Sequence, residues 1–519
     1  MSERSLSRRD LLRGGRDVGG LLALSTLHLD AAQVALRAAP DVYQSIGVRP
    51  LVNGRGTFTI ISGSLMLPEV RAAMDAAAKH YVHLDELAEA IGARLATLTG
   101  AEWGLVTAGC SAGLTHATAA CVAGGNPDLH VRIPNLAGFP KDEVIIPKHS
   151  RNVYDAAVRT IGVRVIEVDT VAELESALGP RTAMIYIMAS PRVDESALSL
   201  KAMAPIARAK GVPILVDAAA EILTIPNVHL QNGASLVGYS GGKCLRGPQT
   251  AGLLLGRKDL VKAAWVHSAP HHGPGRALKV GKEEAIGMLM AVEMWVKRDH
   301  AAEWQQWTAM LQHIDSRMRP LAGVTTAISQ PNGLSNRTPS LRVLWDPLVR
   351  GLTNDAVVRT LFETEPRIAL AATRQGALSG VSVTPYMMSP GDEKIIADRL
   401  FAVLSSGRPQ TSAGPSAPAS DLTGRWDVRI DYAAGSSTHT LHLRQRGNDI
   451  DGSHQGEFVT RDVAGTIDGD AVRIRSAFGE DHGDSITFVF TGKVAGNEMS
   501  GALDMGEYLG ATWKARRRG

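Results

Sequence analysis

Two chemically reactive side chains stand close together on the glycine-rich segment LVGYSGGKCLRGPQTAGLLLG, residues 236–256. Residues 238–242, GYSGG, match the G-x-S-x-G pattern, in which a serine hydroxyl is the nucleophile of a hydrolase; that serine is Ser240. Lys243 instead offers an amine that can form a Schiff base with a carbonyl compound. The two hypotheses require different residues elsewhere in the chain, so the remaining sequence can distinguish them.

The serine hypothesis requires a strand before Ser240 and a helix directly after it. The run SLVGYS predicts the strand, but Gly247-Pro248 would break a helix soon after its start. A base is available from three downstream histidines: His267, His271 and His272. Ser240 and Lys243 also fit the S-x-x-K pattern of penicillin-binding enzymes, but the S-D-N and K-T-G motifs that accompany it do not occur in this sequence. A serine hydrolase using Ser240 therefore stays open as an alternative.

The lysine hypothesis, with pyridoxal phosphate as the carbonyl compound, requires an acid that keeps the pyridine nitrogen protonated. Asp217 ends the apolar run PILVD, where a parallel strand would present it at the carboxyl edge of a sheet. The alternative for an aspartate after a strand is a helix N-cap. This hypothesis predicts that Asp217 and Lys243 share one site.

The same cofactor needs backbone amides for its phosphate and a side chain over its ring. Residues 106–124, VTAGCSAGLTHATAACVAG, predict a strand, a turn at 109–113 and a helix, whose first N–H groups favour a dianion. We therefore assign Gly109, Cys110, Ser111 and Ala112 to cofactor binding. His149, which follows the apolar run EVIIP, could stack on the ring, and a capping or surface role is the alternative. The glycine-rich turn, His149, Asp217 and Lys243 follow the order of the large aspartate-aminotransferase-like fold.

The elements between residues 48 and 404 predict an α/β fold. Short apolar runs such as EVIIP, VRVIEV, AMIYIMA and PILVD alternate with helical periods at 171–178 and 199–210. Such alternation indicates a mostly parallel sheet with helices on both faces. A long helix is expected over 283–318, and residues 319–404 predict a smaller α+β domain. The large domain is assigned to residues 41–318.

The last quarter of the chain has a different pattern. Residues 405–420, SSGRPQTSAGPSAPAS, have the composition of a flexible linker. Residues 421–519 contain about eight segments with period-two alternation, from GRWDVRIDY to GATWKARR. This pattern predicts a small antiparallel barrel or sandwich, most simply an attachment or stabilising module without chemistry of its own.

Charge, cysteines and the N-terminus narrow the possible functions. A net charge of +3 over 519 residues argues against nucleic acid as the main partner. The three cysteines form no C-x-x-C pair, so we predict neither a disulfide framework nor a metal site. SRRDLL at 7–12 resembles a twin-arginine export signal, so residues 1–40 are assigned to a leader and the protein to the periplasm or beyond. The alternative is an amphipathic basic helix or a disordered arm on a cytoplasmic protein. No apolar run is long enough to span a bilayer.

Four segments together resemble one family. SGGKCLRGPQTAGLLLGRKDL, ILVDAAAE, GRALKVGKEEAIGMLMAVE and VTPYMMSPGDEKIIADRL are similar to the selenocysteine-synthase-like pyridoxal phosphate enzymes, in particular to the D-glucosaminate-6-phosphate ammonia-lyase type. The resemblance covers about 48–404 and implies that Lys243 carries the Schiff base. It also implies that Asp217 pairs with the pyridine nitrogen and that residues 110–112 and Ser240 contact the phosphate. A homo-oligomer with its active site at a subunit interface is implied as well. Cys110, the leader and the β-rich tail depart from the family pattern.

The resemblance implies α,β-elimination from an amino acid or amino sugar acid, with release of ammonia. Lys243 would remove the α-proton, and a racemase or transferase on the same scaffold stays open. A non-catalytic binding protein that works through its β-rich tail is a further alternative. Three arginines are predicted to hold anionic groups of the substrate, with a solvated surface charge as the alternative for each: Arg246 on the lysine segment, Arg276 beside Lys279 and Lys282, and Arg342 in SLRVLWD.

Overall fold

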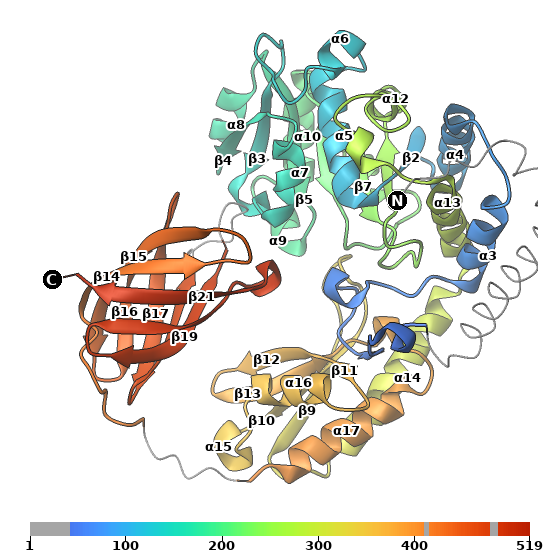
Figure 1. The fold of residues 1–519 in the computed structure, drawn as a ribbon. Helices are drawn as coiled ribbons and strands as arrows, with labels where there is room; N and C mark the ends of the chain where they lie inside the picture. The colour runs from blue at the N-terminus through green and yellow to red at the C-terminus, as the bar shows by residue number, and fades with distance from the viewer. Residues whose placement is uncertain (1–41, 409–414, 478–485, 519) are drawn as a thin grey trace, which may run out of the picture. The chain divides into compact units, whose positions relative to one another are not determined.

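The computed structural model describes residues 42–408, 415–477 and 486–518 (Figure 1). The predicted leader and residues 409–414 of the predicted linker lie outside these ranges. By backbone contacts the described chain forms two compact units, one of residues 42–55, 309–328 and 341–408, the other of 56–308, 329–340 and the C-terminal strands. Within the described ranges, no helix is both long enough and apolar enough to cross a membrane.

A seven-stranded sheet forms the centre of the α/β region. Its strands, in spatial order, are β2 (Trp103–Thr107), β8 (Gly252–Gly256), β7 (Leu236–Ser240), β6 (Ile214–Asp217), β5 (Thr182–Met188), β3 (Glu143–Pro147) and β4 (Arg164–Val168). β7, β6, β5, β3 and β4 are parallel, whereas β8 is antiparallel to both β7 and β2. The prediction of a mostly parallel sheet is confirmed. β2 therefore runs in the same direction as the five parallel strands.

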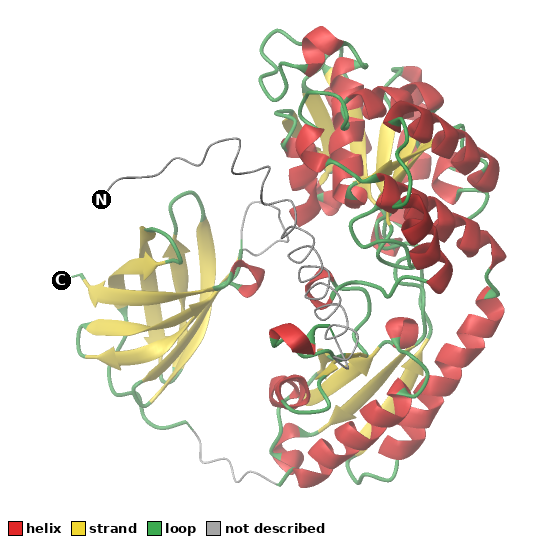
Figure 2. Cartoon of the chain, turned by 45° about the vertical axis from the view of Figure 1, so that its right-hand side comes forward, coloured by secondary structure: helices red, strands yellow, loops and turns green. Residues whose placement is uncertain are grey.

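Helices surround this sheet, as the red ribbons about the yellow strands show (Figure 2). The longer ones are α3 (Pro68–Ala77), α4 (Leu84–Thr99), α5 (Gly109–Ala123), α8 (Val171–Ala177), α10 (Leu200–Ala209), α12 (Lys258–Val266) and α13 (Lys282–Lys297). The short ones are α6 (Pro127–His130), α7 (Ala156–Arg159), α9 (Pro191–Asp194) and α11 (Val228–Gln231). α5 packs on β7 and β8, and its residues Cys110 and Leu114 join Tyr186 and Leu215 of the sheet in one buried core.

The long helix predicted over 283–318 is two helices, α13 and α14 (His300–Met318). α13 ends because Arg298 adopts an extended conformation with ψ of 142°. Asp299 then accepts hydrogen bonds from the amides of Ala301 and Ala302, at 3.1 and 2.9 Å. An aspartate that caps backbone amides in this way starts a new helix, and helical periodicity alone does not show the interruption.

The smaller unit is built on a four-stranded sheet of order β12-β13-β10-β9. Its elements are β1 (Val52–Asn53), β9 (Val324–Ser329), β10 (Ser340–Trp345), α15 (Pro347–Arg350), α16 (Asn354–Glu363), β11 (Ile368–Ala369), β12 (Ala371–Gln375), β13 (Leu378–Val383) and α17 (Asp392–Ser406). Trp345 and Leu400, both fully buried, belong to its core.

Two segments belong to units other than their place in the sequence suggests. β1 pairs in parallel with β11, so residues 42–55 join the smaller unit. Residues 329–340 join the larger one, because the amide of Ile222 donates to the carbonyl of Leu334 at 3.1 Å and that of Asn336 donates to Ala220 at 2.8 Å. The units divide within α14, ahead of the predicted boundary at 318. Pairings between such distant segments leave no local sequence signal.

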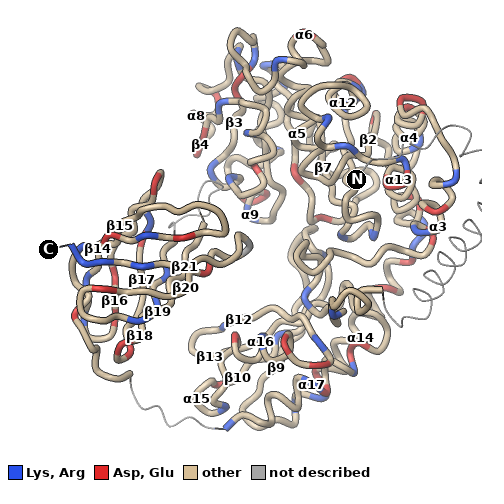
Figure 3. The backbone as a smooth tube through the Cα atoms, viewed as in Figure 1, with Lys and Arg blue, Asp and Glu red and all other residues tan. Residues whose placement is uncertain are grey.

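The C-terminal strands form a closed antiparallel barrel of eight strands, which decides between the barrel and the sandwich. They are β14 (Gly424–Asp431), β15 (Ser436–Arg446), β16 (Asp449–Gln455), β17 (Thr460–Asp468), β18 (Ala471–Ala477), β19 (Phe488–Ala495), β20 (Glu498–Asp504) and β21 (Gly510–Arg517). β14 pairs with β21 and closes the ring. Trp426, Phe490 and Trp513 lie in its interior core, as side chains fill a barrel of this size. Basic and acidic residues are interspersed along its strands (Figure 3).

Candidate active site

The carboxyl ends of β2, β3, β6 and β7 lie at one edge of the large sheet, because these strands all run in the same direction. Each is followed by a segment that the sequence marked as functional. Gly109 lies two residues after the end of β2, and His149 lies two residues after the end of β3. Asp217 is the last residue of β6, and Lys243 follows β7. The fold therefore gathers these segments at the edge where ligands of open α/β sheets bind.

Asp217 is a buried carboxylate, with 5% of its surface exposed. Its Oδ2 accepts a hydrogen bond from the hydroxyl of Tyr186 at 3.1 Å, and its Oδ1 accepts one from the amide of Ala219 at 3.0 Å. Burial raises the pKa of Asp217, while these hydrogen bonds and the charge of Lys243 act to lower it. A buried carboxylate with several donors suits the task of holding a cationic nitrogen.

Lys243 lies on a compact turn that backbone hydrogen bonds hold in place. The amide of Gly241 donates to Ala251 at 2.8 Å, and that of Gly247 donates to Gly241 at 2.9 Å. A Cβ at Gly241 would meet the carbonyl oxygen of Ala251 at 2.7 Å, so the turn requires glycine there. Lys243 is half-buried and forms no ion pair with any residue in the described ranges. Its amine is thus available at the sheet edge that holds Asp217.

The first turn of α5 has the form of an anion cradle. Gly109 has φ of +83°, which turns the chain from β2 into the helix, and a Cβ there would meet no atom within 4 Å. Ser111 is exposed on the first turn. The strand beneath approaches closely, since a Cβ at Gly252 would lie 2.3 Å from the carbonyl carbon of Gly109. The first amides of a helix have no partner within the helix, and the space beside Gly109 is open, so this turn suits a phosphate.

The side chain of Cys110 contacts the carboxylate of Asp217 and is not part of this cradle. Its Sγ lies 3.6 Å from Oδ1 of Asp217, and burial together with the charge of Asp217 raises the pKa of the thiol. The cysteine is therefore a neutral donor beside Asp217. A contact of residues 110–112 with a phosphate involves the backbone amide of Cys110 and not its side chain, and it stays a prediction.

His149 is half-buried in the 3₁₀ turn Lys148–Ser150. Its Nδ1 lies 3.0 Å from the hydroxyl of Ser150, and its Nε2 lies 3.1 Å from that of Ser196. Burial lowers the pKa of the imidazole. Both ring nitrogens are thus engaged in the plane of the ring, which leaves its faces for stacking, and that role stays a prediction.

Ser240 ends β7, but the residues that follow do not form a nucleophile elbow. Residues 241–245 form a turn, and the next regular element is strand β8. No histidine in the described ranges lies within hydrogen-bond distance of the Ser240 hydroxyl. A hydrolase nucleophile needs both the helix and the base, so the geometry does not support the serine hypothesis. Its contact with a phosphate stays a prediction.

The predicted substrate-binding cations differ in their surroundings. Arg246 has φ of +53°, and its Nε donates to the carbonyl of Leu65 at 3.0 Å. Burial lowers the pKa of Arg246. Arg276 and Lys279 are exposed, and Lys282 pairs with Glu283. Arg342 lies half-buried on β10, in the smaller unit. Their contacts with a substrate stay predictions.

Three further parts of the site carry no pattern that marks them in the sequence: Tyr186, Asn152 and the segment 59–67. Tyr186 lies within the apolar run AMIYIMA. The only feature of the sequence that could have pointed to it is that a tyrosine buried in such a run needs a hydrogen-bond partner for its hydroxyl. Asn152 follows His149 by three residues, and its Nδ2 lies 3.3 Å from the Tyr186 hydroxyl. The segment 59–67 lies against the lysine turn, since a Cβ at Gly63 would meet the carbonyl oxygen of Gly242 at 2.7 Å. These contacts join residues that are far apart in the sequence, so no local pattern indicates them.

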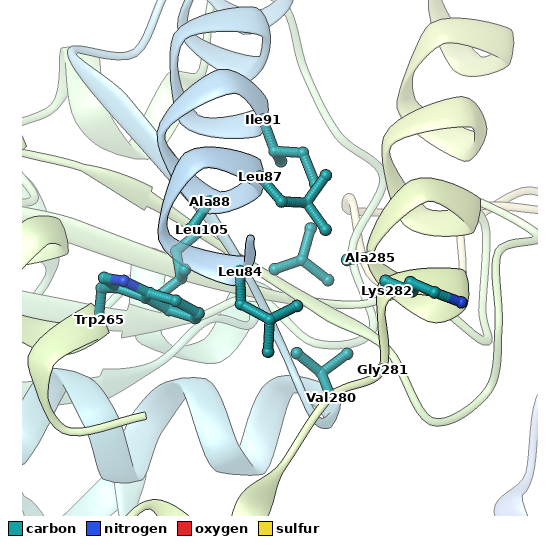
Figure 4. Close-up of a pocket in the computed structure, with 11 residues that line it drawn as sticks. Leu84, Leu87, Ala88, Ile91, Leu105, Trp265, Val280, Gly281, Lys282 and Ala285 are labelled. Carbon is teal, nitrogen blue, oxygen red and sulfur yellow. The ribbon is translucent and has the colours of Figure 1, made fainter. Parts of the chain in front are cut away.

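A separate apolar pocket lies at the start of α4 and α13 (Figure 4). The side chains of Leu84, Leu87, Leu105 and Trp265 converge there, and Lys282 is at its edge. Its lining is apolar apart from Lys282, unlike the sheet edge that carries Asp217 and Lys243. Among the residues in the described ranges, no group of three or more His, Cys, Asp or Glu side chains is placed to hold a metal ion.

Comparison with known proteins identifies the family. The model of class-V aminotransferases matches residues 145–319. D-glucosaminate-6-phosphate ammonia lyase of Salmonella typhimurium is 30% identical over 377 residues, which are 70% of this chain and 97% of that protein. The chain belongs to this pyridoxal-phosphate-dependent family. 5'-C-glycyluridine monooxygenase-decarboxylase of a Streptomyces species is 31% identical over 375 residues, 70% of this chain and 92% of that protein. The selenium transferase of Moorella thermoacetica is a more distant relative, 26% identical over 53% of this chain and 62% of that protein.

The solved structure of D-glucosaminate-6-phosphate ammonia-lyase matches the fold of this family member with a TM-score of 0.63 and 28% identity, over 71% of this chain and 99% of that one. The family uses pyridoxal phosphate, and the residues present fit it. Asp217 is buried and hydrogen-bonded at the end of β6, Lys243 has no ion-pair partner in the described ranges, and the start of α5 offers open space beside Gly109.

Proposed function

We propose that this protein is a pyridoxal-phosphate-dependent lyase that eliminates ammonia from an amino acid or amino sugar acid. The observation that carries the proposal is that a buried carboxylate, Asp217, ends β6, and an amine without an ion-pair partner in the described ranges, Lys243, follows the neighbouring parallel strand β7. Bound pyridoxal phosphate supplies an electron sink that stabilises negative charge at the α-carbon of an amino acid. The relative named for D-glucosaminate-6-phosphate ammonia lyase supports elimination as the outcome.

Each residue has a defined task in this scheme. Asp217 would hold the pyridine nitrogen and keep a proton on it. The amides of Gly109 to Ala112 would hold the phosphate at the start of α5. Lys243 would hold the cofactor through a Schiff base; when the substrate amine takes its place there, the freed Lys243 amine would accept the α-proton of the substrate. Arg246 and Arg276 orient the anionic groups of the substrate.

A second candidate is an oxygen-dependent decarboxylation of a related amino acid. The relative named as a monooxygenase-decarboxylase is as similar to this chain as the lyase is, 31% against 30%. Both reactions use the electron sink but differ in the bond that breaks and in the need for dioxygen. Racemisation and amino-group transfer start with the same proton removal and are further alternatives.

The experiment that tests the proposal measures products under air and under nitrogen. The holoprotein is supplied with D-glucosaminate-6-phosphate and with a panel of hydroxy amino acids, and ammonia, keto acid, carbon dioxide and dioxygen are measured. Elimination predicts equal ammonia and keto acid without dioxygen, and no product from Lys243→Ala. Dioxygen uptake with release of carbon dioxide supports the second candidate. A change of optical rotation without ammonia identifies a racemase and contradicts the proposal.

We also propose that the protein is exported through the twin-arginine route and forms a homo-oligomer. The sequence SRRDLL at 7–12 supports export, and replacement of Arg8 and Arg9 by lysine should retain the protein in the cytoplasm.

The homo-oligomer is supported by two apolar side chains that flank the lysine turn. Ile60 and Leu65 are 80% and 62% exposed there and support a subunit contact. Light scattering on the purified protein should give a mass above 55.1 kDa, and a monomer contradicts the contact.

A further inference from the structure

We propose that Asn152 and Tyr186 form a directed hydrogen-bond relay that ends on Asp217 and controls how strongly this carboxylate holds the proton of the pyridine nitrogen. The inference rests on the proposed function, because it concerns the same carboxylate. Both residues are positioning residues that act through Asp217.

Tyr186 is placed by the register of the parallel sheet. In the pairing of β5 with β6, Tyr186 lies opposite Leu215 and Met188 lies opposite Asp217. Residues two apart on a strand share a face, so the phenol and the carboxylate lie on the same face. The Tyr186 hydroxyl then meets Oδ2 of Asp217 at 3.1 Å, and no part of the tyrosine side chain is exposed.

Asn152 determines which atom is the donor in the hydrogen bond between Tyr186 and Asp217. Its Oδ1 accepts from the amide of Tyr154 at 2.7 Å, and its Nδ2 donates to the carbonyl of Ser150 at 2.7 Å. A flipped amide would lose both bonds, so Nδ2 is the atom that faces Tyr186, at 3.3 Å. Since Nδ2 can only donate, the Tyr186 hydroxyl accepts from Asn152 and donates its own proton to Asp217.

Because Tyr186 donates to Asp217, it affects how strongly the carboxylate binds a proton. A donor stabilises the ionised carboxylate and lowers its proton affinity. The pKa of Asp217 is accordingly raised by burial and lowered by the Tyr186 hydrogen bond, and burial and the charge of Asp217 raise the pKa of Tyr186, so the phenol keeps its proton. Without the donor, the proton shared between Asp217 and the pyridine nitrogen moves toward the carboxylate. The electron sink is then weaker.

The chain offers a matched control in Tyr239. This tyrosine lies on β7, the strand on the other side of β6 from the strand of Tyr186. It is 1% exposed and accepts a hydrogen bond from Asn227 at 2.7 Å. It thus reproduces the buried tyrosine–asparagine pair, but its hydroxyl has no hydrogen bond to Asp217. Tyr239→Phe and Tyr186→Phe remove the same atom from the same kind of environment.

The experiment records the ¹⁵N resonance of the pyridine nitrogen in holoprotein loaded with ¹⁵N-labelled pyridoxal phosphate. Wild type and Tyr239→Phe should give the position of a protonated nitrogen, and Tyr186→Phe should move it toward the neutral position at the same pH. The affinity for pyridoxal phosphate should fall about tenfold in Tyr186→Phe, as expected for a lost hydrogen bond to a charged group. Asn152→Ala should move the resonance less, and it should have no further effect in the Tyr186→Phe background.

Two results would overturn the relay. An unchanged resonance in Tyr186→Phe shows that the phenol does not control the proton, and equal shifts in both tyrosine variants show a packing effect. If wild-type protein takes up no pyridoxal phosphate, the proposed function fails and the relay fails with it. A holoprotein with an unresponsive resonance removes only the relay.

Discussion

The Sγ atom of Cys110 lies 3.6 Å from Oδ1 of Asp217, although 107 residues separate them in the chain. The contact joins the first turn of α5, which is suited to a phosphate, to the end of β6, which is suited to a cationic ring nitrogen. The two ends of a pyridoxal phosphate molecule would therefore be held by elements that touch each other. Both side chains are buried, so the contact lies inside the fold.

The close approach of β8 to α5 predicts that Gly252→Ala is strongly destabilising. Its Cβ would lie 2.3 Å from the carbonyl carbon of Gly109 and 2.4 Å from the amide of Cys110, so the backbone must move. We expect a loss of about 1–3 kcal/mol in the free energy of unfolding and weaker retention of pyridoxal phosphate. Gly179→Ala, where a Cβ would meet no atom within 4 Å, is the control. Equal urea midpoints for the two variants would refute this packing.

The packing of Cys110 predicts a compensating pair of substitutions. A Cβ at Gly238 would lie 2.9 Å from Sγ of Cys110, so Gly238→Ala should destabilise the protein by about 1–3 kcal/mol. Cys110→Ala removes the sulfur and should relieve most of this loss. Urea denaturation of both single variants and the double variant measures the coupling. Strictly additive losses would mean that the two side chains do not compete for this space.

Asp217→Asn should separate catalysis from stability. An amide cannot hold a proton on the pyridine nitrogen, so turnover should fall by about 100-fold or more. Since burial raises the pKa of Asp217, its ionised form is costly in the folded protein. The apoprotein should therefore melt at the same temperature as wild type or above it. A variant that keeps wild-type turnover would remove Asp217 from the site.

Buried histidines predict that the α/β unit loses stability in mild acid. Burial lowers the pKa of His116 to about 4 and that of His267 to about 3, against 6.5 for the unfolded chain. The unfolded state therefore binds more protons as pH falls below 6.5, and each histidine costs the folded state about 1.4 kcal/mol per pH unit until its own pKa is reached. Urea denaturation at several pH values should show a shallower slope for His116→Leu.

The exposed His80 gives the control for that slope, since His80→Leu also removes one histidine from the same unit. A wild-type free energy of unfolding that stays constant between pH 7 and pH 5 would contradict the burial of these imidazoles.

Residues with a local signature were predictable, and residues defined by distant partners were not. Asp217 ends an apolar run and Lys243 follows a strand and two glycines, so pattern and order marked both as candidates, and their roles stay predictions. Tyr186 and Asn152 become meaningful only through contacts across the sheet, at 31 and 34 residues of separation. No local pattern marks such a pair.

The barrel shows the same contrast. Its eight strands follow the eight alternating segments closely, because one face of each strand is buried and the other is solvated. Closure depends on the pairing of Trp426 with Arg517 and its neighbours in the first and last strands, so the sequence left barrel and sandwich open.

The most direct test of the account is to reduce the purified holoprotein with borohydride and map the modified peptide by mass spectrometry. A lysine that forms a Schiff base with pyridoxal phosphate becomes permanently labelled by this treatment. We predict the label on Lys243, and its loss in Lys243→Ala. A label on another lysine, or no label after incubation with pyridoxal phosphate, would contradict the assignment of Lys243 as the reactive amine.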